Sequence, residues 1–505
     1  MALVVFVSTP YENLGIEYLS SCLKLHGHKV ELAVDPCLFR NPYHRSNFWG
    51  GVFDHSWITV ERVLSLNPDI VAFSVMTDTY QWASRLAGRI KEKSAVPIVF
   101  GGVHATLSPE YVIENPAVDY VCVGEGEDVV VGLANKIADY GGCASIPGLW
   151  AKRGARVIKN EPDKNLKDLD TLPFPDKDLY YLRHGIYSGE YLMMSGRGCR
   201  YSCAFCCNSA MLRLHGPGFL RRRSVDGVMA ELSAAKRKYG FRFVWFMDDN
   251  FTGDGAWLES FSESYRKYIN LPFFCYSRPE DMSAEKARLL KEAGCYEAAV
   301  GVETINSGTS EIINRSVVRK SIRRAISSLK RSGIVTVAEN ILGLPGETEA
   351  DVLALAEFYN GVQPDFVMYS WLKIFPGTPV FSRLKEMGLM DLLKIKAVSE
   401  GRDDSLACGG NYANADKFKK AAWLLVLSPF IPSGLLTACI RSKIFRFLPP
   451  CSDFFLLFVR MMKITCLADL VAPKRTYDAG ARLTLRIYVY FSWQKFKRLF
   501  LGTYA

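Results

Sequence analysis

The segment Gly196-Arg197-Gly198-Cys199-Arg200-Tyr201-Ser202-Cys203-Ala204-Phe205-Cys206-Cys207-Asn208 carries the most closely spaced cysteines in the chain. Three of them, Cys199, Cys203 and Cys206, have the spacing C-x3-C-x2-C on a loop that begins with two glycines. Three thiolates at this spacing can bind three irons of a cubane iron–sulfur cluster. Because a fourth cysteine of similar spacing is absent, the pattern predicts a cluster with one open iron. Cys207 falls outside the pattern, and we interpret it as a packing residue.

Two other interpretations fit this cysteine group less well. A zinc site would normally have four protein ligands in paired C-x2-C or Cys/His spacing, and no partner pair accompanies these three. Packing cysteines do not usually come three together on a glycine-rich loop. The first residues, MALVVFVSTP, have no basic region and no cleavage site, so we expect no signal peptide and a cytoplasmic protein. In such a reducing compartment, clustered cysteines act as metal ligands or catalytic groups.

The cysteine segment follows the first of six expected βα units. Ser224 and Ser283 precede two of the expected helices, and Gly240 and Gly294 follow them, which are ordinary start and stop signals. Six units predict a partial (β/α)6 barrel over residues 190–395, with its chemistry at the carboxyl ends of the strands. The expected strands are 191–195, 241–247, 273–277, 298–303, 336–342 and 366–374.

Residues 1–140 also alternate apolar strands with helices. This alternation predicts an α/β, doubly wound, flavodoxin-like domain with a parallel sheet covered on both faces. Ligands of such sheets bind beyond the carboxyl ends of the strands. The polar residues 141–189, with Pro173 and Pro175, are expected to be a linker. The expected strands are 2–8, 29–35, 69–76, 97–102 and 118–124, and the expected helices are 15–26, 78–93 and 127–140.

The cysteine motif, with the aromatic Phe205 before its third cysteine, resembles that of the radical S-adenosylmethionine superfamily. The resemblance implies a [4Fe-4S] cluster whose open iron binds the amino and carboxylate groups of S-adenosylmethionine. It also implies that an electron from the reduced cluster cleaves this cosubstrate and releases a 5′-deoxyadenosyl radical. Further matches follow the barrel strands. The implied S-adenosylmethionine site consists of Phe205, Asp248, Asp249, Glu303, Gly343 and Pro376.

Three of these strand ends differ in how closely they follow the superfamily. The Asp248-Asp249 pair stands where a Gly-Gly-Glu element is usual, and the resemblance implies that it meets the amino group of the cosubstrate. Glu303 is implied to accept hydrogen bonds from the ribose hydroxyls. Gly343 opens a Gly-Leu-Pro-Gly-Glu-Thr segment whose last three residues, 346–348, are explained equally well as a helix cap.

The order of the two domains resembles the cobalamin-binding branch of this superfamily, over roughly residues 1 to 395. The segment Pro10–Gly15, the Gly-Gly-x-His-Ala-Thr loop and the Gly-Glu-Gly-Glu loop carry this likeness. Glycines at strand ends let the backbone approach the corrin closely, and hydroxyls after the third strand would face its nucleotide tail. A domain that has lost cobalamin remains an alternative. The implied cobalamin residues are Ser74, Thr77, Gly101, Gly102, His104, Gly124, Glu125 and Gly126.

The usual Asp-x-His-x-x-Gly signature of cobalamin domains is missing from the chain. No lower cobalt ligand can therefore be assigned. We interpret His104 as a nucleotide-loop or capping residue rather than a cobalt ligand.

The C-terminal region, residues 396–505, is basic and apolar and is expected to be mostly helical. From Lys417 onward it contains 15 Lys and Arg against three Asp, whereas the whole chain has a net charge of +10. The basic charge thus belongs to one segment, which argues against nucleic-acid binding. Residues 421–440 carry no charge but contain Pro429, Pro432 and Gly434, and 454–462 are also apolar. Such a segment fits peripheral contact with an anionic membrane, or equally a helical domain over the barrel mouth.

The resemblance implies a radical enzyme, with a cobalamin-dependent C-methyltransferase as the favoured activity. One S-adenosylmethionine would give its methyl group to cobalamin, and a second would yield the radical that activates the substrate. A radical cyclase of tetrapyrrole or lipid metabolism is the alternative within this branch, and a non-catalytic iron–sulfur and cobalamin carrier is the alternative of another class. The expected partners are a small hydrophobic substrate and an electron donor such as flavodoxin or ferredoxin. No residue can be assigned to the chemistry on the substrate.

Overall fold

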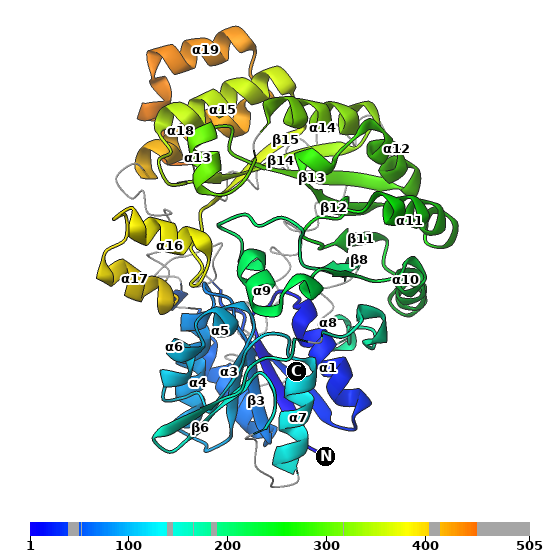
Figure 1. The fold of residues 1–505 in the computed structure, drawn as a ribbon, viewed down its shortest axis with the longest axis vertical. Coiled ribbons are helices and arrows are strands. Elements are labelled where there is room, and N and C mark those ends of the chain that lie inside the picture. The colour runs from blue at the N-terminus through cyan, green and yellow to red at the C-terminus, as the bar shows by residue number, and fades with distance from the viewer. Residues whose placement is uncertain are drawn as a thin grey trace, which may run out of the picture.

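The computed structural model describes residues 1–38, 50–51, 53–138, 145–164, 166–182, 189–316, 318–402 and 415–451. Two α/β domains lie end to end along the long axis of the molecule (Figure 1). The N-terminal domain, in blue and cyan, is at the bottom, and the larger domain, in green and yellow, is above it. Helices α9 (Cys207–His215), α16 (Pro379–Glu386) and α17 (Leu392–Ser399) lie between the two.

The N-terminal sheet has the strand order β2-β1-β3-β4-β5-β6-β7. Its first five strands in the chain are parallel, and their 2-1-3-4-5 order is that of flavodoxin-like folds, with the topological switch point between β1 and β3. The predicted doubly wound fold is therefore confirmed. The strands are β1 (Leu3–Ser8), β2 (Lys29–Val34), β3 (Ile70–Ser74), β4 (Ile98–Gly101), β5 (Tyr120–Cys122), β6 (Leu149–Arg153) and β7 (Arg156–Lys159).

Helices cover both faces of this sheet because its strands are apolar on both sides. Along β1, Val4 and Phe6 belong to one core cluster, whereas Val5 and Val7 belong to another on the opposite face. The first face is covered by α1 and α7, and the second by α3, α4 and α6. The helices are α1 (Leu14–Leu25), α3 (Ser56–Ser65), α4 (Tyr80–Lys91), α5 (Val103–Leu107), α6 (Pro109–Glu114) and α7 (Glu127–Ala138).

The range 141–189, which we expected to be a linker, contains part of the N-terminal domain. Strands β6 and β7 form an antiparallel hairpin that pairs with β5, so the sheet continues to Lys159. Leu149, Trp150 and Ala151 are buried, which gives β6 an apolar surface to place against the domain. The connector that follows holds only η1 (Leu169–Thr171) and α8 (Asp178–Tyr181) among its described residues.

The larger domain is the predicted partial barrel. Its six strands are all parallel in the order β8-β11-β12-β13-β14-β15, so β8 and β15 are the two edges. The strands are β8 (Glu190–Met193), β11 (Phe243–Phe246), β12 (Phe273–Ser277), β13 (Cys295–Glu303), β14 (Val335–Leu342) and β15 (Phe366–Trp371). Its outer helices are α10 (Val225–Tyr239), α11 (Gly255–Tyr268), α12 (Ala284–Ala293), α13 (Ser307–Ile312), α14 (Arg319–Arg331) and α15 (Glu349–Val362).

The helix signals predicted in the barrel are confirmed. Ser224 and Ser283 accept backbone hydrogen bonds as N-caps of α10 and α12. Gly240 and Gly294 end these helices with φ of 64° and 102°, a left-handed conformation that favours glycine.

The described C-terminal region contains α18 (Ala415–Leu427), α19 (Ser433–Ser442) and η7 (Ile444–Phe447). Helix α18 packs on α15 and β15, and Phe418, Leu424 and Leu425 belong to the barrel's main core. The first part of the apolar run is therefore core on the outside of the barrel, neither a membrane surface nor a cover for the barrel mouth. No helix among the described residues is long and apolar enough to cross a membrane. The apolar run 454–462 lies outside the described residues.

Candidate functional site

The cysteine loop is held at its base by a short antiparallel ladder. Strand β9 (Gly196–Arg197), just before Cys199, pairs with β10 (Arg221–Arg222), so the loop between them starts and ends at one place. Gly198 has a φ of 84°, and a Cβ there would lie 3.0 Å from the ring of Phe219. Both the conformation and the space thus require glycine at this position.

The predicted ligands lie on this loop and at the start of the helix that follows it. Cys203 is buried, Cys199 and Cys206 are half-buried, and Cys206 is the N-cap residue of α9. Cys207 is the first residue of the helix itself. Burial raises the pKa of the Cys199 thiol to about 11, so metal binding must drive the loss of its proton.

Two buried arginines that the sequence analysis missed approach the Cys203 sulfur. Arg278 Nη1 lies 3.0 Å from Cys203 Sγ, and Arg315 Nη1 lies 3.5 Å from it. Both residues are 6% exposed. They follow β12 and α13, far from the cysteines in sequence, so no local motif could have pointed to them.

This donor set fits a cubane. Among the described residues, no three His, Cys, Asp or Glu side chains converge enough to hold one metal ion. A cubane requires no such convergence, because each thiolate binds a different iron. Three cysteines on one loop, with positive charge beside the most buried of them, can hold a cluster whose fourth iron remains open.

The two adjacent aspartates after β11 have different surroundings. Asp248 is buried and accepts hydrogen bonds from the Ser195 backbone N–H at 3.1 Å and from its hydroxyl at 2.7 Å. It therefore ties β11 to the end of β8. Asp249 is exposed. Desolvation by the surrounding protein raises the pKa of its carboxyl, and the Asn208 side chain partly opposes this rise. Of the two carboxylates, Asp249 is the one available to a ligand.

Glu303, at the end of β13, has an unusual backbone conformation. Its φ is 68°, and the pairing of β13 with β14 shifts register between Gly301 and Glu303. A left-handed φ is costly for a residue with a Cβ, and such residues are enriched at functional sites. The Glu303 carboxylate is half-buried and lies 3.9 Å from Arg315. Burial raises the pKa of this carboxyl, and Arg315 and Arg278 oppose the rise.

The loop after β14 is held by its own carboxylate. Glu347 accepts from the backbone N–H groups of Gly343 at 2.6 Å and Leu344 at 3.1 Å. Thr348 and Asp351 form a capping box at the start of α15, which confirms the capping interpretation of 346–348. The Gly343 N–H is thus already engaged within the loop.

Two further residues of the implied S-adenosylmethionine site, Phe205 on the cysteine loop and Pro376 after β15, are packed into the protein. Phe205 packs against a small core cluster around Leu344 and Ile374. Pro376 is buried in the loop after β15, and Ala204 accepts from Val380 N–H just beyond that loop.

The carboxyl edge of the N-terminal sheet offers a backbone cradle at the predicted cobalamin loops. Gly102 has a φ of 92°, and a Cβ there would lie 2.8 Å from the carbonyl oxygen of Val75. Gly101, Gly102 and Ser74 are half-buried side by side at the ends of β3 and β4. These residues fit a cofactor that needs close backbone approach and a hydroxyl.

His104 and Thr77 point into the protein instead. His104 is 0% exposed, its Nδ1 lies 3.1 Å from Thr77 Oγ1, and its ring packs against the Tyr80 ring at a tilt of 40°. Burial lowers the pKa of His104 to about 4. The backbone of Ser399, at the end of α17, lies beside the His104 ring and partly opposes this lowering of its pKa. In this structure His104 has no accessible surface to offer a ligand.

The Gly-Glu-Gly-Glu loop after β5 reaches the barrel. Arg197 of the cysteine segment pairs with Glu125 at 3.2 Å and with Glu127 at 2.5 Å, and Arg221 also pairs with Glu125. Arg197 lowers the pKa of Glu127, against the effect of burial. Glu125, expected to contact cobalamin, thus bridges the two domains, because two arginines of the β9–β10 ladder lie beside it.

The two other residues of this loop are packed closely. A Cβ on Gly124 would lie 2.8 Å from the His215 ring of α9, and one on Gly126 would lie 3.1 Å from Leu19. These glycines let the loop approach α9 and α1.

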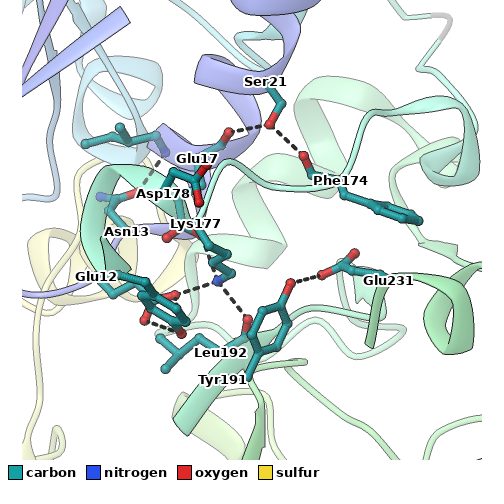
Figure 2. A network of polar contacts seen from close by, with 12 residues as sticks. Glu12, Asn13, Glu17, Ser21, Phe174, Lys177, Asp178, Tyr191, Leu192 and Glu231 are labelled. Atoms are coloured by element: carbon teal, nitrogen blue, oxygen red, sulfur yellow. Dashed lines mark hydrogen bonds and ion pairs between the residues drawn. The ribbon is translucent and has the colours of Figure 1, made fainter. Parts of the chain in front are cut away.

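A buried ionic network forms a second joint between the domains (Figure 2). Lys177 of the connector is 1% exposed and lies 2.5 Å from Glu12 and 2.8 Å from Glu17. Its ammonium also donates to the Leu192 carbonyl of β8 at 2.8 Å and lies over the Tyr191 ring. One cation thereby links the loop before α1, helix α1 and the first barrel strand.

Comparison with known proteins agrees with this two-domain site. The model of the radical SAM superfamily matches residues 193–359, and that of the B12 binding domain matches residues 2–134. An uncharacterized methyltransferase of Pyrococcus horikoshii is 28% identical over 383 residues, 74% of this chain and 78% of that protein. An anaerobic magnesium-protoporphyrin IX monomethyl ester cyclase of Rubrivivax gelatinosus is 24% identical over 338 residues, 64% of this chain and 60% of that protein.

A solved structure shows the same fold. The cobalamin-dependent S-adenosylmethionine radical enzyme OxsB, with aqua-cobalamin and S-adenosylmethionine bound, aligns with a TM-score of 0.66. Sequence identity is 16%, and the alignment covers 97% of this chain and 84% of that one.

Proposed function

Because the chain belongs to the radical S-adenosylmethionine superfamily and carries a B12-binding domain, we propose that it methylates an unactivated carbon of a hydrophobic substrate. It is a radical S-adenosylmethionine enzyme whose cofactors are a [4Fe-4S] cluster, S-adenosylmethionine and cobalamin. When bound, the cluster supplies the electron that cleaves S-adenosylmethionine, and cobalamin supplies the methyl group. The observation that carries the proposal is the joint between Glu125, Glu127 and Arg197, two residues before the first cluster cysteine.

The chain's own residues hold the cluster loop and the cobalamin domain in a fixed position relative to each other. Arg197 is anchored to the cobalamin domain at its side chain and to the β9–β10 ladder at its backbone. These ion pairs therefore tie the base of the cluster loop to the loop after β5. Asp249 after β11 and Glu303 at the end of β13, with β12 between these strands, are the carboxylates assigned to the amino and ribose groups of S-adenosylmethionine. Such fixed geometry lets a short-lived radical meet its target before side reactions occur.

Product analysis distinguishes methyl transfer from the alternatives. The protein is reconstituted anaerobically with iron, sulfide and hydroxocobalamin, then incubated with reductant and S-adenosylmethionine carrying a deuterated methyl group. A methyltransferase forms both S-adenosylhomocysteine and 5′-deoxyadenosine, since it uses one cosubstrate for each half of the reaction. A cyclase, the second candidate, is favoured by the likeness to the Rubrivivax enzyme and forms 5′-deoxyadenosine without S-adenosylhomocysteine.

A carrier protein forms neither product when fully loaded with cluster. The proposal fails if 5′-deoxyadenosine appears and S-adenosylhomocysteine does not. The reducing electron is assigned to flavodoxin or ferredoxin, and replacing the chemical reductant by either protein should sustain 5′-deoxyadenosine release.

Peripheral membrane contact is proposed for a smaller surface than the sequence alone suggested. The residues around α19 and η7 expose apolar side chains, with Leu435 56%, Ile444 57% and Phe447 90% exposed. Arg441 and Lys443 are exposed among them. A surface that combines apolar side chains with cations suits an anionic lipid leaflet.

Vesicle flotation tests this surface. The protein should float with anionic vesicles at low salt and bind less as salt rises, because each basic group contributes about 1 kcal/mol before screening. Phe447→Glu should abolish flotation, whereas Tyr268→Glu on α11, also an exposed aromatic, should not. Equal flotation of the two variants would rule out α19 and η7 as the contact.

A further inference from the structure

The carboxylates near Arg278 and Arg315 balance only part of the positive charge of these two arginines. Arg278 lies 3.2 Å from Glu280 through Nε and stacks 3.6 Å over the Tyr201 ring. Its Nη1 is directed at Cys203 instead of at a carboxylate. Burial costs a guanidinium much of its hydration, so such groups normally face an anion. Nη1 meets the Cys203 sulfur, which is an anionic thiolate when it binds iron.

Arg315 approaches the same sulfur from the segment that follows α13. It donates to the carbonyl oxygen of Gly301 through Nη2, and its nearest carboxylate, Glu303, is 3.9 Å away. The side chain is thus fixed by a neutral backbone group, and its Nη1 is left for Cys203 at 3.5 Å.

We propose that Arg278 and Arg315 raise the reduction potential of the [4Fe-4S] cluster by donating hydrogen bonds to the Cys203 sulfur. One-electron reduction of the cluster adds a unit of negative charge, part of which resides on the thiolate sulfurs. Nearby cations and N–H donors stabilise the reduced state more than the oxidised state, and hydrogen bonds to sulfur are among the factors that set cluster potentials. The two arginines are positioning residues for the cluster, and they make it easier for the electron donor to reduce it.

The experiment measures the cluster's midpoint potential in reconstituted full-length protein without S-adenosylmethionine, cobalamin or substrate. Dithionite with redox mediators supplies the electron, and the electron paramagnetic resonance signal of the reduced cluster reports its extent. Arg278→Gln and Arg315→Gln should both shift the potential to more negative values. The shift should be larger for Arg278→Gln, because its N–S distance is shorter.

Arg200→Gln is the matched control. Arg200 is an arginine of the cluster loop itself, but its side chain is 49% exposed and pairs with Asp281. The potential of Arg200→Gln should shift far less than that of Arg278→Gln, because solvent and Asp281 screen the Arg200 charge. If a Gln variant does not hold the cluster, the corresponding Lys variant, which keeps the positive charge but loses the fixed fork of guanidinium N–H donors, should show a potential more negative than that of the unmodified protein.

An unchanged potential in the Gln or Lys variants with intact clusters would overturn the proposal. If a separate binding measurement on these variants then shows weaker S-adenosylmethionine binding, the arginines are assigned to the cosubstrate instead. Because the measurement involves no methyl transfer, its outcome is independent of the proposed reaction. Failure of the unmodified protein to bind a cluster would instead contradict the cofactor assignment.

Discussion

The carboxyl edge of the N-terminal sheet and the carboxyl ends of the barrel strands both carry glycine-rich loops with acidic residues. In the N-terminal domain, Glu125 and Glu127 are engaged by Arg197 across the domain boundary. In the barrel, Asp249 and Glu303 keep exposed or half-buried carboxylates. The same kind of motif thus serves as a joint in one domain and as a candidate ligand site in the other.

The difference lies in where the cations come from. The β9–β10 ladder presents Arg197 and Arg221 to the loop after β5. In the barrel, Arg278 after β12 and Arg315 after α13 both approach a cysteine more closely than a carboxylate. A carboxylate after a parallel strand is therefore not a ligand by position alone. Its role depends on whether a distant part of the chain supplies a cation to it.

The largest expected effect comes from removing a cluster ligand. Cys199→Ala, Cys203→Ala or Cys206→Ala should each abolish the brown cluster, because each supplies one of three thiolates. Cobalamin should still be retained at about one corrin per chain through gel filtration, since one switch point offers one site. Iron content and absorbance measure both. If corrin is lost together with the cluster, the N-terminal domain and the barrel do not bind their cofactors independently.

Cys207→Ala is the control for this prediction. It should keep both cofactors, because Cys207 lies outside the motif and begins α9. Loss of the cluster in this variant would show that the three ligands are assigned wrongly.

The next effect concerns the joint around Lys177. Lys177→Met should lower the free energy of unfolding by about 3–5 kcal/mol, because it leaves buried Glu12 and Glu17 without their cation. Urea unfolding measures it. Lys24→Met removes a pair with Asp176 whose lysine side chain is 44% exposed, and it should cost less than about 1 kcal/mol. Similar losses in the two variants would mean that the buried Lys177 pairs stabilise the fold no more than the exposed Lys24 pair does.

A pH effect is expected at the loop after β14. Burial raises the pKa of Glu347 to about 8 from its ordinary 4.5, so between these values the folded protein holds a proton that the unfolded chain has lost. Stability should therefore fall as pH rises across this window, by about 3 kcal/mol from pH 5 to pH 8. Glu347→Gln cannot titrate and should be more stable than the unmodified protein at pH 8.

The difference between Glu347→Gln and the unmodified protein should shrink to less than about 1 kcal/mol at pH 5, where the folded side chain is neutral in both proteins and the unfolded carboxyl has only begun to ionise. Unfolding midpoints at the two pH values measure this. Glu386→Gln, a change at an exposed carboxylate on α16, should leave the pH profile as it is. If Glu347→Gln behaves in the same way, the Glu347 carboxylate is already ionised in the folded protein.

The smallest effect on stability is expected at the joint between Arg197, Glu125 and Glu127. Arg197→Ala should destabilise the protein by about 1–3 kcal/mol, because Glu127 is left buried without its partner. Since Arg197 lowers the pKa of Glu127, the loss should be greatest near neutral pH and fade in acid, where that carboxyl is protonated in both states. Arg213→Ala, an exposed arginine on α9 that donates to the Gly377 carbonyl, should cost little.

Much of the fold could be predicted because it depends on local patterns. The strand ranges of both sheets agree with the expected ones to within a few residues, since apolar runs of fixed length alternate with helices. The hairpin β6–β7 was assigned to the linker because its exposed β7, with Arg156 and Lys159, lacks an apolar pattern. Helix α18 was considered for a membrane surface because an uncharged helix has the same sequence whether it packs on a barrel or on lipid.

The sequence by itself determined the cluster motif and the two domains, because cysteine spacing and strand periodicity are local properties of the chain. Only the tertiary structure decided which acids stay available. Asp248 is bound by Ser195 and Glu125 by Arg197, whereas Asp249 and Glu303 remain accessible. It also brought Arg278 and Arg315 to Cys203 from 75 and 112 residues away. Charge pairing depends on distance in space, and sequence separation does not report that distance.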